Sequence, residues 1–435
     1  MTMELMKQVI SNCLPSSKSV QESIGLKLTE IGLVPEDWPL STFGSICSAI
    51  GDGIHSTPIF NSNGEYYFVN GNNLVHGRVT LSDDTKKADN VEFNKHQKPL
   101  GDRTILISIN GTIGNIAIYR SEKIILGKSA AYLNIKSNVD KGYIFHCLNS
   151  DATQKAFNNG LTGSTIKNLG LGTIRNTVLP LPPIQEQTAI ANALSDVDAL
   201  IQELEKLIAK KQAIKTATMQ QLLTGRTRLP PFGFEKSAHH PDGRKKGYKP
   251  SELGEIPEDW EIVSIGDTLS IRHGKNQKAV ENPSGAIPIF ATGGQIGWAD
   301  QSLWEKPSVL IGRKGTIDKP RFAEEPFWTV DTLFYSEIKN CADAKFIFYK
   351  FCMIDWMQYN EASGVPSLNA STIERVLTSL PVKEEQLAIA LVLSAVDEEI
   401  NALEQRLNKT RQIKQGMMQE LLTGKTRLVK PAGAA

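Results

Sequence analysis

The chain has 435 residues and lacks the features that mark several large classes of protein. Its five cysteines form no Cys-x-x-Cys pair, so neither a disulfide framework nor a cysteine-rich zinc site is indicated. No apolar run approaches the length of a membrane span, and the polar first residues do not resemble a secretory signal. We therefore expect a cytoplasmic protein whose thiols are reduced.

The sequence also lacks the motifs of the common catalytic sites. It has no Gly-x-Ser-x-Gly elbow, no His-Glu-x-x-His motif and no glycine-rich dinucleotide fingerprint. Residues 127–129 resemble the end of a phosphate-binding loop, but Glu122 stands where that loop requires its first glycine. His239 and His240 have no third histidine or cysteine nearby to complete a metal site. We expect no active site, metal or cofactor in this chain.

A strong positive charge is missing as well. The formal net charge is +1, whereas a strongly basic domain is the usual mark of a nucleic-acid binder. The basic residues are unevenly distributed, however, and in the second half they cluster at residues 272–278 and 313–321. A local basic surface is therefore still compatible with the sequence.

What the chain does contain is a long internal repeat. Residues 181–229 align without a gap with residues 380–428, and 26 of the 49 positions are identical. Farther upstream, Val-Pro-Glu-Asp-Trp at residues 34–38 recurs as Ile-Pro-Glu-Asp-Trp at residues 256–260. A repeat of this length indicates two similar halves.

Each repeated segment has the signals of one long helix. It opens next to a proline and closes with Leu-Leu-Thr-Gly, which are typical helix start and stop signals. Apolar residues recur between them at alternating spacings of three and four, as in a coiled-coil seam. The seam positions are Leu194, Val197, Ile201, Leu204 and Ile208 in the first copy, and Leu393, Val396, Ile400, Leu403 and Leu407 in the second. We expect the two helices to pair with each other; the alternative is that each packs only on its own domain.

The regions before the helices contain short apolar runs separated by Gly, Asn and Pro, which predict strands and turns, with a hairpin turn at Asn110-Gly111. Here the repeat is looser: residue 68 matches 290, and the turn at 108–110 matches 312–314. The fold class is therefore α+β. The predicted parts are an N-terminal arm with a short helix (1–32), a strand-rich domain (33–180), a long helix (181–229), an exposed linker (230–254), a second strand-rich domain (255–379), a second long helix (380–428) and a tail (429–435).

The duplicated order of variable strand-rich domain, Leu-Pro-x-x-x-Glu-Gln-x-x-Ile-Ala, long helix and Leu-Leu-Thr-Gly-[Arg/Lys]-Thr-Arg-Leu resembles the specificity subunit of Type I restriction-modification enzymes. The resemblance implies a non-catalytic subunit with two target recognition domains, each reading one half of a bipartite, asymmetric DNA site. It also implies two methyltransferase subunits and restriction/translocase subunits as partners, which would hold S-adenosylmethionine, ATP and Mg. If the coiled-coil helices pair antiparallel between the domains, a pseudo-twofold axis relates the halves, as it relates the strands of a duplex.

DNA contacts are expected from amide, hydroxyl and basic side chains in the loops of these domains. The candidates are Asn70, Asn72, Asn73, Ser108, Asn110, Lys128, Lys167 and Asn168 in the first domain, and Lys275, Asn276, Gln277, Lys278, Arg313, Lys314 and Arg321 in the second. For each of them the alternative is a solvated loop residue. The turns at 108–110 and 312–314 are the strongest candidates, because their flanks match while their tips differ.

Two other functions are compatible with parts of the sequence. A coiled-coil scaffold that joins protein partners without reading DNA explains the helices and the near-neutral charge, but it gives no reason for two similar domains with divergent loops. An enzyme with an unrecognised active site is the weaker alternative.

Overall fold

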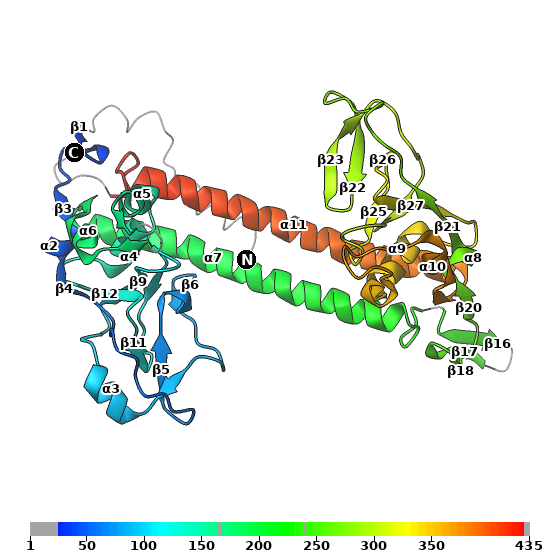
Figure 1. Cartoon of the computed structure of the whole chain (residues 1–435), viewed down its shortest axis with the longest axis horizontal. Coiled ribbons are helices and arrows are strands. Elements are labelled where there is room, and N and C mark those ends of the chain that lie inside the picture. The colour runs from blue at the N-terminus through cyan, green and yellow to red at the C-terminus, as the bar shows by residue number, and fades with distance from the viewer. Residues whose placement is uncertain (1–24, 164–166, 231, 238–239, 430–435) are drawn as a thin grey trace. The chain divides into compact units, whose positions relative to one another are not determined.

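The computed structural model describes residues 25–163, 167–230, 232–237 and 240–429 (Figure 1). The chain has an α+β fold and divides into two compact units. The first unit comprises residues 1–204 and 406–435, and the second comprises residues 205–405. Each unit contains one strand-rich domain and one half of each long helix. None of the helices in the described ranges is both long and apolar enough to cross a membrane.

The first unit is built on a four-stranded antiparallel sheet in which one of the two inner strands, β9, is buried along its whole length. The order of this sheet is β10 (Ile116–Ile118), β9 (Thr104–Ser108), β12 (Ala130–Ile135) and β4 (Cys47–Asp52). A second sheet has the order β11 (Ile124–Leu126), β5 (Tyr66–Val69) and β8 (Lys87–Ala88). Two-stranded pairs are β1 (Leu26–Thr29) with β2 (Gly32–Pro35), β3 (Leu40–Thr42) with β15 (Val178–Pro180), β6 (Leu74–Val75) with β7 (Arg78–Val79), and β13 (Leu161–Thr162) with β14 (Asn168–Leu169).

Most short helices of the first unit begin at polar caps. The side chain of Asp140 accepts a hydrogen bond from the Tyr143 N–H, and Ser150 does the same for Thr153, because the first N–H groups of a helix have no partner within it. Caps of this kind begin α2 (Phe43–Ile46), α3 (Asn90–His96), α4 (Lys141–Leu148) and α5 (Asp151–Asn159), whereas α6 (Leu171–Asn176) follows Gly170 and has no side-chain cap. The 3-10 turn η1 spans Gly71–Asn73.

The second unit repeats this plan. Its main sheet has the order β21 (Leu269–His273), β27 (Leu333–Ile338), β24 (Ser308–Gly312) and β25 (Arg321–Ala323), and its second sheet the order β23 (Gly294–Ala299), β22 (Ile287–Ala291) and β26 (Trp328–Thr329). Two-stranded pairs are β16 (Phe234–Ser237) with β17 (His240–Lys245), β18 (Tyr248–Ser251) with β19 (Gly254–Pro257), and β20 (Glu261–Ser264) with β28 (Leu377–Leu380). The helices are α8 (Ile265–Thr268), α9 (Ala344–Met353) and α10 (Ala370–Arg375), with the 3-10 turn η2 (Trp356–Tyr359).

The two long helices are α7 (Ile184–Leu222) and α11 (Lys383–Leu421), each of 39 residues. Both are shorter than the repeated segments, because proline lies at the entry and a glycine with positive φ follows the end, at Gly225 (φ 73°) and Gly424 (φ 71°).

Within each unit the halves of α7 and α11 run antiparallel. In the first unit Lys414 forms an ion pair with Asp198 at 2.6 Å. In the second, Lys211 pairs with Glu399 at 2.7 Å and Lys215 with Asp397 at 2.6 Å, so residue numbers rise on one helix as they fall on the other. Seven seam positions are buried and three are partly buried; the buried ones are Leu194, Val197, Leu204, Ile208, Leu393, Ile400 and Leu407. The pairing within each unit is confirmed, and the supercoil stays a prediction.

Two of the expected boundaries cross strands of the structure. Residues 230–254, expected to be an exposed linker, contain strands β16, β17 and β18, and β19 begins at Gly254. The border drawn after residue 32 cuts the β1–β2 hairpin. The β1–β2 hairpin and the β18–β19 hairpin are equivalent members of the repeat. Each turns through a glycine with positive φ, Gly32 (φ 106°) in the first and Gly254 (φ 90°) in the second. The helix expected in the arm lies outside the described residues.

Candidate nucleic-acid interface

Four loops of the first domain converge on one surface, which we call the first recognition surface: residues 70–72, 109–112, 127–129 and 167–168. The Ser129 hydroxyl donates to Asn70 Oδ1 and accepts from the Gly71 N–H, both at 2.9 Å. The backbone of Ile109 donates to Ser129 O at 2.9 Å, and Asn110 forms a β-bridge with Asn168. Loops far apart in the sequence are thereby joined by backbone and short polar contacts.

The predicted residues of this surface divide into outward and inward groups. Asn72, Lys128 and Lys167 are exposed, and Asn110 and Asn168 are partly buried. Ser108 was a wrong choice as a contact, because it is fully buried and its Oγ donates to Asn110 O at 3.2 Å.

Two further predicted contact residues, Asn70 and Asn73, use their side-chain amides in hydrogen bonds within the domain. The Asn73 amide donates to Thr80 O at 3.2 Å, while its Oδ1 accepts from the Asn70 N–H at 2.9 Å. The Asn70 side chain is the acceptor of the Ser129 hydroxyl described above. Both shape the loop at residues 70–73 and leave Asn72 as its outward amide.

The second domain has the same backbone frame. The Arg313 N–H donates to Thr332 O at 2.8 Å, as Ile109 does to Ser129 O. The Leu368 N–H donates to Arg313 O at 3.0 Å, as Leu169 does to Ile109 O at 2.9 Å. The predicted match of the turns at 108–110 and 312–314 is therefore confirmed. These turns belong to longer connections than the two-residue hairpin expected at Asn110-Gly111, since β9 ends at Ser108 and β10 begins at Ile116.

The match of residue 68 with residue 290 is wrong by one position. The Gly127 N–H donates to Val69 O at 2.8 Å, and the equivalent Val330 N–H donates to Phe290 O at 3.0 Å. Phe290 therefore corresponds to Val69. The error arises because a phenylalanine occurs close to the same place in both strands.

The second recognition surface comprises residues 275–278, 313–315 and 366–367. Lys275, Asn276, Lys278 and Lys314 are exposed, and Gln277 is partly buried. Arg313 is also partly buried and its guanidinium donates to Asp331 O at 3.3 Å. Lys314 forms a β-bridge with Ser367, as Asn110 does with Asn168. The last candidate, Arg321, donates to Gly293 O at 3.1 Å and is partly buried.

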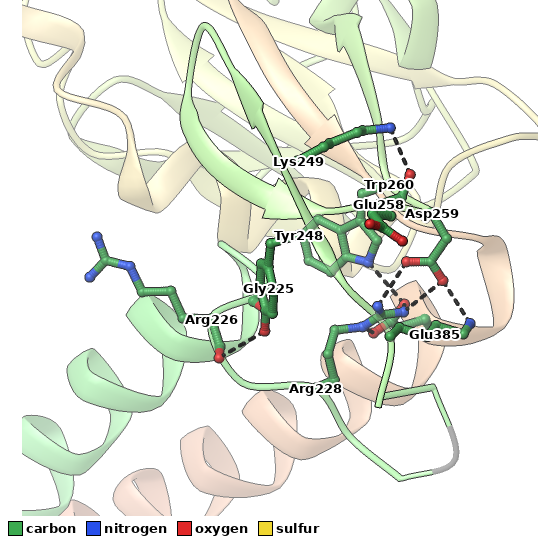
Figure 2. Close-up of polar contacts among 10 residues, drawn as sticks. Gly225, Arg226, Arg228, Tyr248, Lys249, Glu258, Asp259, Trp260 and Glu385 are labelled. Carbon is green, nitrogen blue, oxygen red and sulfur yellow. Dashed lines mark hydrogen bonds and ion pairs between the residues drawn. The ribbon is translucent and has the colours of Figure 1, made fainter. Parts of the chain in front are cut away.

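An ion-pair cluster with a buried arginine–glutamate pair at its centre joins the end of α7, the β18–β19 region and the start of α11 within the second unit (Figure 2). We call it the central clamp: Arg228, Asp259, Trp260 and Glu385. Arg228 binds Glu385 with two hydrogen bonds of 2.6 Å and Asp259 with bonds of 2.8 and 3.1 Å. The indole N–H of Trp260 donates to Glu385 at 3.1 Å, and the guanidinium lies 5.7 Å from the indole ring. Lys246 adds a bond to Asp259 at 2.7 Å.

The same cluster occurs in the first unit, where we call it the terminal clamp: Arg427, Asp37, Trp38 and Glu186. Arg427 binds Glu186 through Nε and Nη2 at 2.5 and 2.7 Å, and it binds Asp37 with two bonds of 3.0 Å. Trp38 donates to Glu186 at 3.2 Å. Both tryptophans are fully buried, and both glutamates are nearly so. Each clamp fixes a hairpin and a strand-rich domain to the ends of the two long helices of its own unit.

The charges in the clamps stabilise one another. Burial opposes the charge on Arg228, but hydrogen bonds to Glu385 and Asp259 outweigh it and raise the pKa of the guanidinium. The hydrogen bond from Arg427 holds the pKa of Asp37 below its usual range. Removal of either partner of such an ion pair lowers the stability of the fold, because the remaining charge would stay desolvated.

The residue after each clamp glutamate is also positioned by the repeat. Gln187 accepts from the Asp140 N–H at 2.9 Å and donates to Pro182 O at 2.7 Å. Gln386 accepts from the Asp343 N–H at 2.8 Å and donates to Pro381 O at 2.8 Å. The Glu-Gln pair thus connects each long helix both to a clamp and to the start of the helix α4 or α9.

Sequence comparison with known proteins gives the family. The sequence model described as "Type I restriction modification DNA specificity domain" matches residues 35–216 and 257–415, which is more than half of the chain. The chain belongs to this family. No group of three or more His, Cys, Asp or Glu residues suited to a metal ion occurs among the described residues.

Individual relatives agree with this assignment. The putative Type I restriction enzyme MjaX specificity subunit of Methanocaldococcus jannaschii is 28% identical over 92% of this chain and 96% of its own length. The MjaVIII specificity subunit of the same organism is also 28% identical, over 72% of this chain and 76% of its own. The crystal structure of an S subunit of a Type I restriction-modification system from M. genitalium has a TM-score of 0.61 at 17% identity, covering 92% of this chain and 99% of that one, and shows a shared fold.

Proposed function

We propose that this chain is the non-catalytic DNA-recognition subunit of a Type I restriction-modification complex, and that each strand-rich domain reads one half of a bipartite, asymmetric site. The observation that carries the proposal is the pair of recognition surfaces. They share the same backbone hydrogen bonds, yet they carry different side chains at the same positions, as Asn110 and Lys314 illustrate. A common frame with exchangeable side chains is suited to reading two different base sequences.

The paired helices would serve the assembly. A helix of 39 residues spans about 58 Å at 1.5 Å per residue, which is long enough to separate two half-sites by unread base pairs. The arginine–glutamate pairs of the clamps and the Glu-Gln pairs are buried, but they give both units the same framework at the ends of the long helices, so that each unit can present an equivalent outer face to one copy of the same partner. We infer that two methyltransferase subunits dock there, that restriction subunits join them, and that S-adenosylmethionine, ATP and Mg bind to these partners. Such a complex would act on DNA in the cytoplasm.

A matched pair of lysines tests DNA binding by the first domain. Lys123 and Lys128 flank strand β11 at opposite ends, and only Lys128 lies on the recognition surface. Lys128→Ala in the full chain with its methyltransferase partner should weaken DNA binding and reduce the salt slope of log K by about one, as expected for one lost phosphate contact. Lys123→Ala, at the Glu65 ion pair, should change neither.

A gel-shift assay of DNA binding also distinguishes the proposed function from that of a scaffold that only joins protein partners. A protein-joining scaffold that does not read DNA predicts no sequence-selective, salt-dependent shift by the complex of this chain with its methyltransferase partner. Equal affinity for all DNA sequences at every salt concentration would therefore contradict the proposed function, even if the partner still assembled.

A further inference from the structure

A second pair of equivalent loops consists of residues 275–278 of the second recognition surface and residues 54–57 of the first domain. In the first domain the Ile54 N–H donates to Leu126 O at 2.7 Å; in the second the Lys275 N–H donates to Thr329 O at 2.8 Å. Each donor follows a glycine, Gly53 or Gly274, at which a side chain would collide with the backbone at the end of the neighbouring strand. The two loops therefore leave their strands in the same way.

The residues that follow the two glycines differ. The second domain continues with Asn276, Gln277 and Lys278, whereas the first continues with His55, Ser56 and Thr57. In the first domain all three of these side chains are exposed. The frame is shared and the side chains diverge, which is the same relation that holds between Asn110 and Lys314. The loop at residues 55–57 thus has the properties expected of a recognition loop, although its composition gave no such signal.

We propose that His55 is a specificity-determining residue that contacts a base in the first half-site. Its side chain is 74% exposed, yet its ring is oriented, because Nε2 lies 2.8 Å from the Asp52 carboxylate. Its neighbour Ile54 forms a β-bridge with Gly127, which places the loop next to Lys128. The oriented His55 ring therefore lies in a loop next to Lys128, whose side chain is suited to a phosphate contact.

The hydrogen bond to Asp52 also determines which ring nitrogen His55 presents to the DNA. A carboxylate only accepts, so the Nε2–H donates to Asp52 and leaves Nδ1 for a polar atom of a base edge in the major groove. We therefore assign His55 to one base pair of the first half-site. Asp52 acts as its positioning residue.

This inference rests on the proposed function, and mapping of methylated adenines separates the two. The full chain would be expressed with its methyltransferase partner, and its methylation motif compared with that of His55→Ala. The variant should lose roughly tenfold of its discrimination at one base pair of one half-site and keep the other half-site unchanged. Asn276→Ala should alter only the other half-site. Lys123→Ala should keep the wild-type motif.

The outcomes are distinct. A wild-type chain that directs methylation to no defined sequence overturns the proposed function and this inference with it. A wild-type bipartite motif that His55→Ala leaves unchanged overturns the assignment of His55 alone. Asp52→Ala provides a second test. Loss of the orienting carboxylate should weaken discrimination at the same base pair as His55→Ala does. A change at a different base pair would contradict the positioning role of Asp52.

Discussion

The clamps and the recognition surfaces of this chain are both duplicated, but they differ in what the duplication preserves. Arg228 and Arg427 each bind a glutamate and an aspartate, and in both units a tryptophan donates to the same glutamate. The turns at Asn110 and Lys314 preserve only the backbone. Side chains are kept where both halves have the same task, and they diverge where each half meets a different ligand.

The largest effect is expected from breaking a clamp. Glu385→Ala removes the acceptor of the Trp260 N–H and leaves the Arg228 side chain, which is 6% exposed, with only the partly exposed Asp259 as its carboxylate partner, and should lower the stability of the second unit by about 3–5 kcal/mol. Urea unfolding, together with hydrogen exchange in the β18–β19 hairpin, measures the change. Glu186→Ala should cause a similar loss in the first unit.

An exposed ion pair in the second unit provides the control for this experiment. Arg272 and Glu337 lie 2.7 Å apart, but the Arg272 side chain is 51% exposed. Glu337→Ala should therefore destabilise the second unit much less than Glu385→Ala does. Equal losses for Glu385→Ala and Glu337→Ala would show that the clamp is an ordinary surface contact.

The next largest effect concerns the divergent turn of the second domain. Replacing Arg313 and Lys314 together with Ala should weaken DNA binding about tenfold or more and flatten its salt dependence, while the methyltransferase partner still binds. Lys306→Ala, an exposed lysine before the opposite end of β24, is the control and should bind DNA normally. Unchanged affinity of the double variant in a low-salt shift assay would remove this turn from the interface.

A smaller effect is expected in how the stability of each unit depends on pH above neutrality. Burial lowers the pKa of Lys350 to about 7, so the unfolded chain binds more protons above that pH and the stability of the second unit should rise by about 1 kcal/mol from pH 7 to pH 8. Lys350→Met should abolish this rise. In the first unit the equivalent residue is Cys147, whose pKa burial raises to about 12, so stability should instead fall above pH 9. Parallel pH profiles of the two units would contradict this difference.

The smallest effect distinguishes the clamps in acid. The pKa of Asp37 is lowered mainly by Arg427; burial opposes the lowering for Asp259, but hydrogen bonds from Arg228 and Lys246 outweigh it. A carboxylate with a depressed folded pKa stabilises the fold above its unfolded pKa of 3.8 and loses that contribution as the pH falls through the folded value. Because Asp259 has the additional Lys246 partner, hydrogen exchange should show the β1–β2 hairpin loosening before β18–β19. The reverse order would contradict this role of Lys246.

The long helices and the frame of the recognition turns were predictable, because both depend on patterns within one segment. The three-and-four spacing around Leu194 and Leu393 indicates a helix and its buried side, and the glycine flanks of residues 108–110 and 312–314 reveal their equivalence. The burial of Ser108 could not be predicted from such a pattern, because β9 is buried on both faces and apolar and polar residues do not alternate along it.

The clamps were missed because their partners are distant in the sequence. Arg228 and Glu385 are 157 residues apart, and Arg427 and Glu186 are 241 apart. All of these residues lie in the repeated motifs, so their identity in both copies was a usable signal, but nothing in the spacing shows that they meet. The hairpins were missed because the match at residues 34–38 was not extended backward, where Lys27 and Gly32 correspond to Lys249 and Gly254.

Single-molecule mapping of methylated adenines in a host that expresses this chain with its methyltransferase partner tests the central claim most directly. Two domains with a shared frame and different recognition side chains predict an asymmetric motif made of two different short half-sites, separated by a fixed number of unspecified base pairs. A symmetric motif, one continuous motif without a gap, or methylation without sequence preference would contradict the claim that each domain reads its own half of the site.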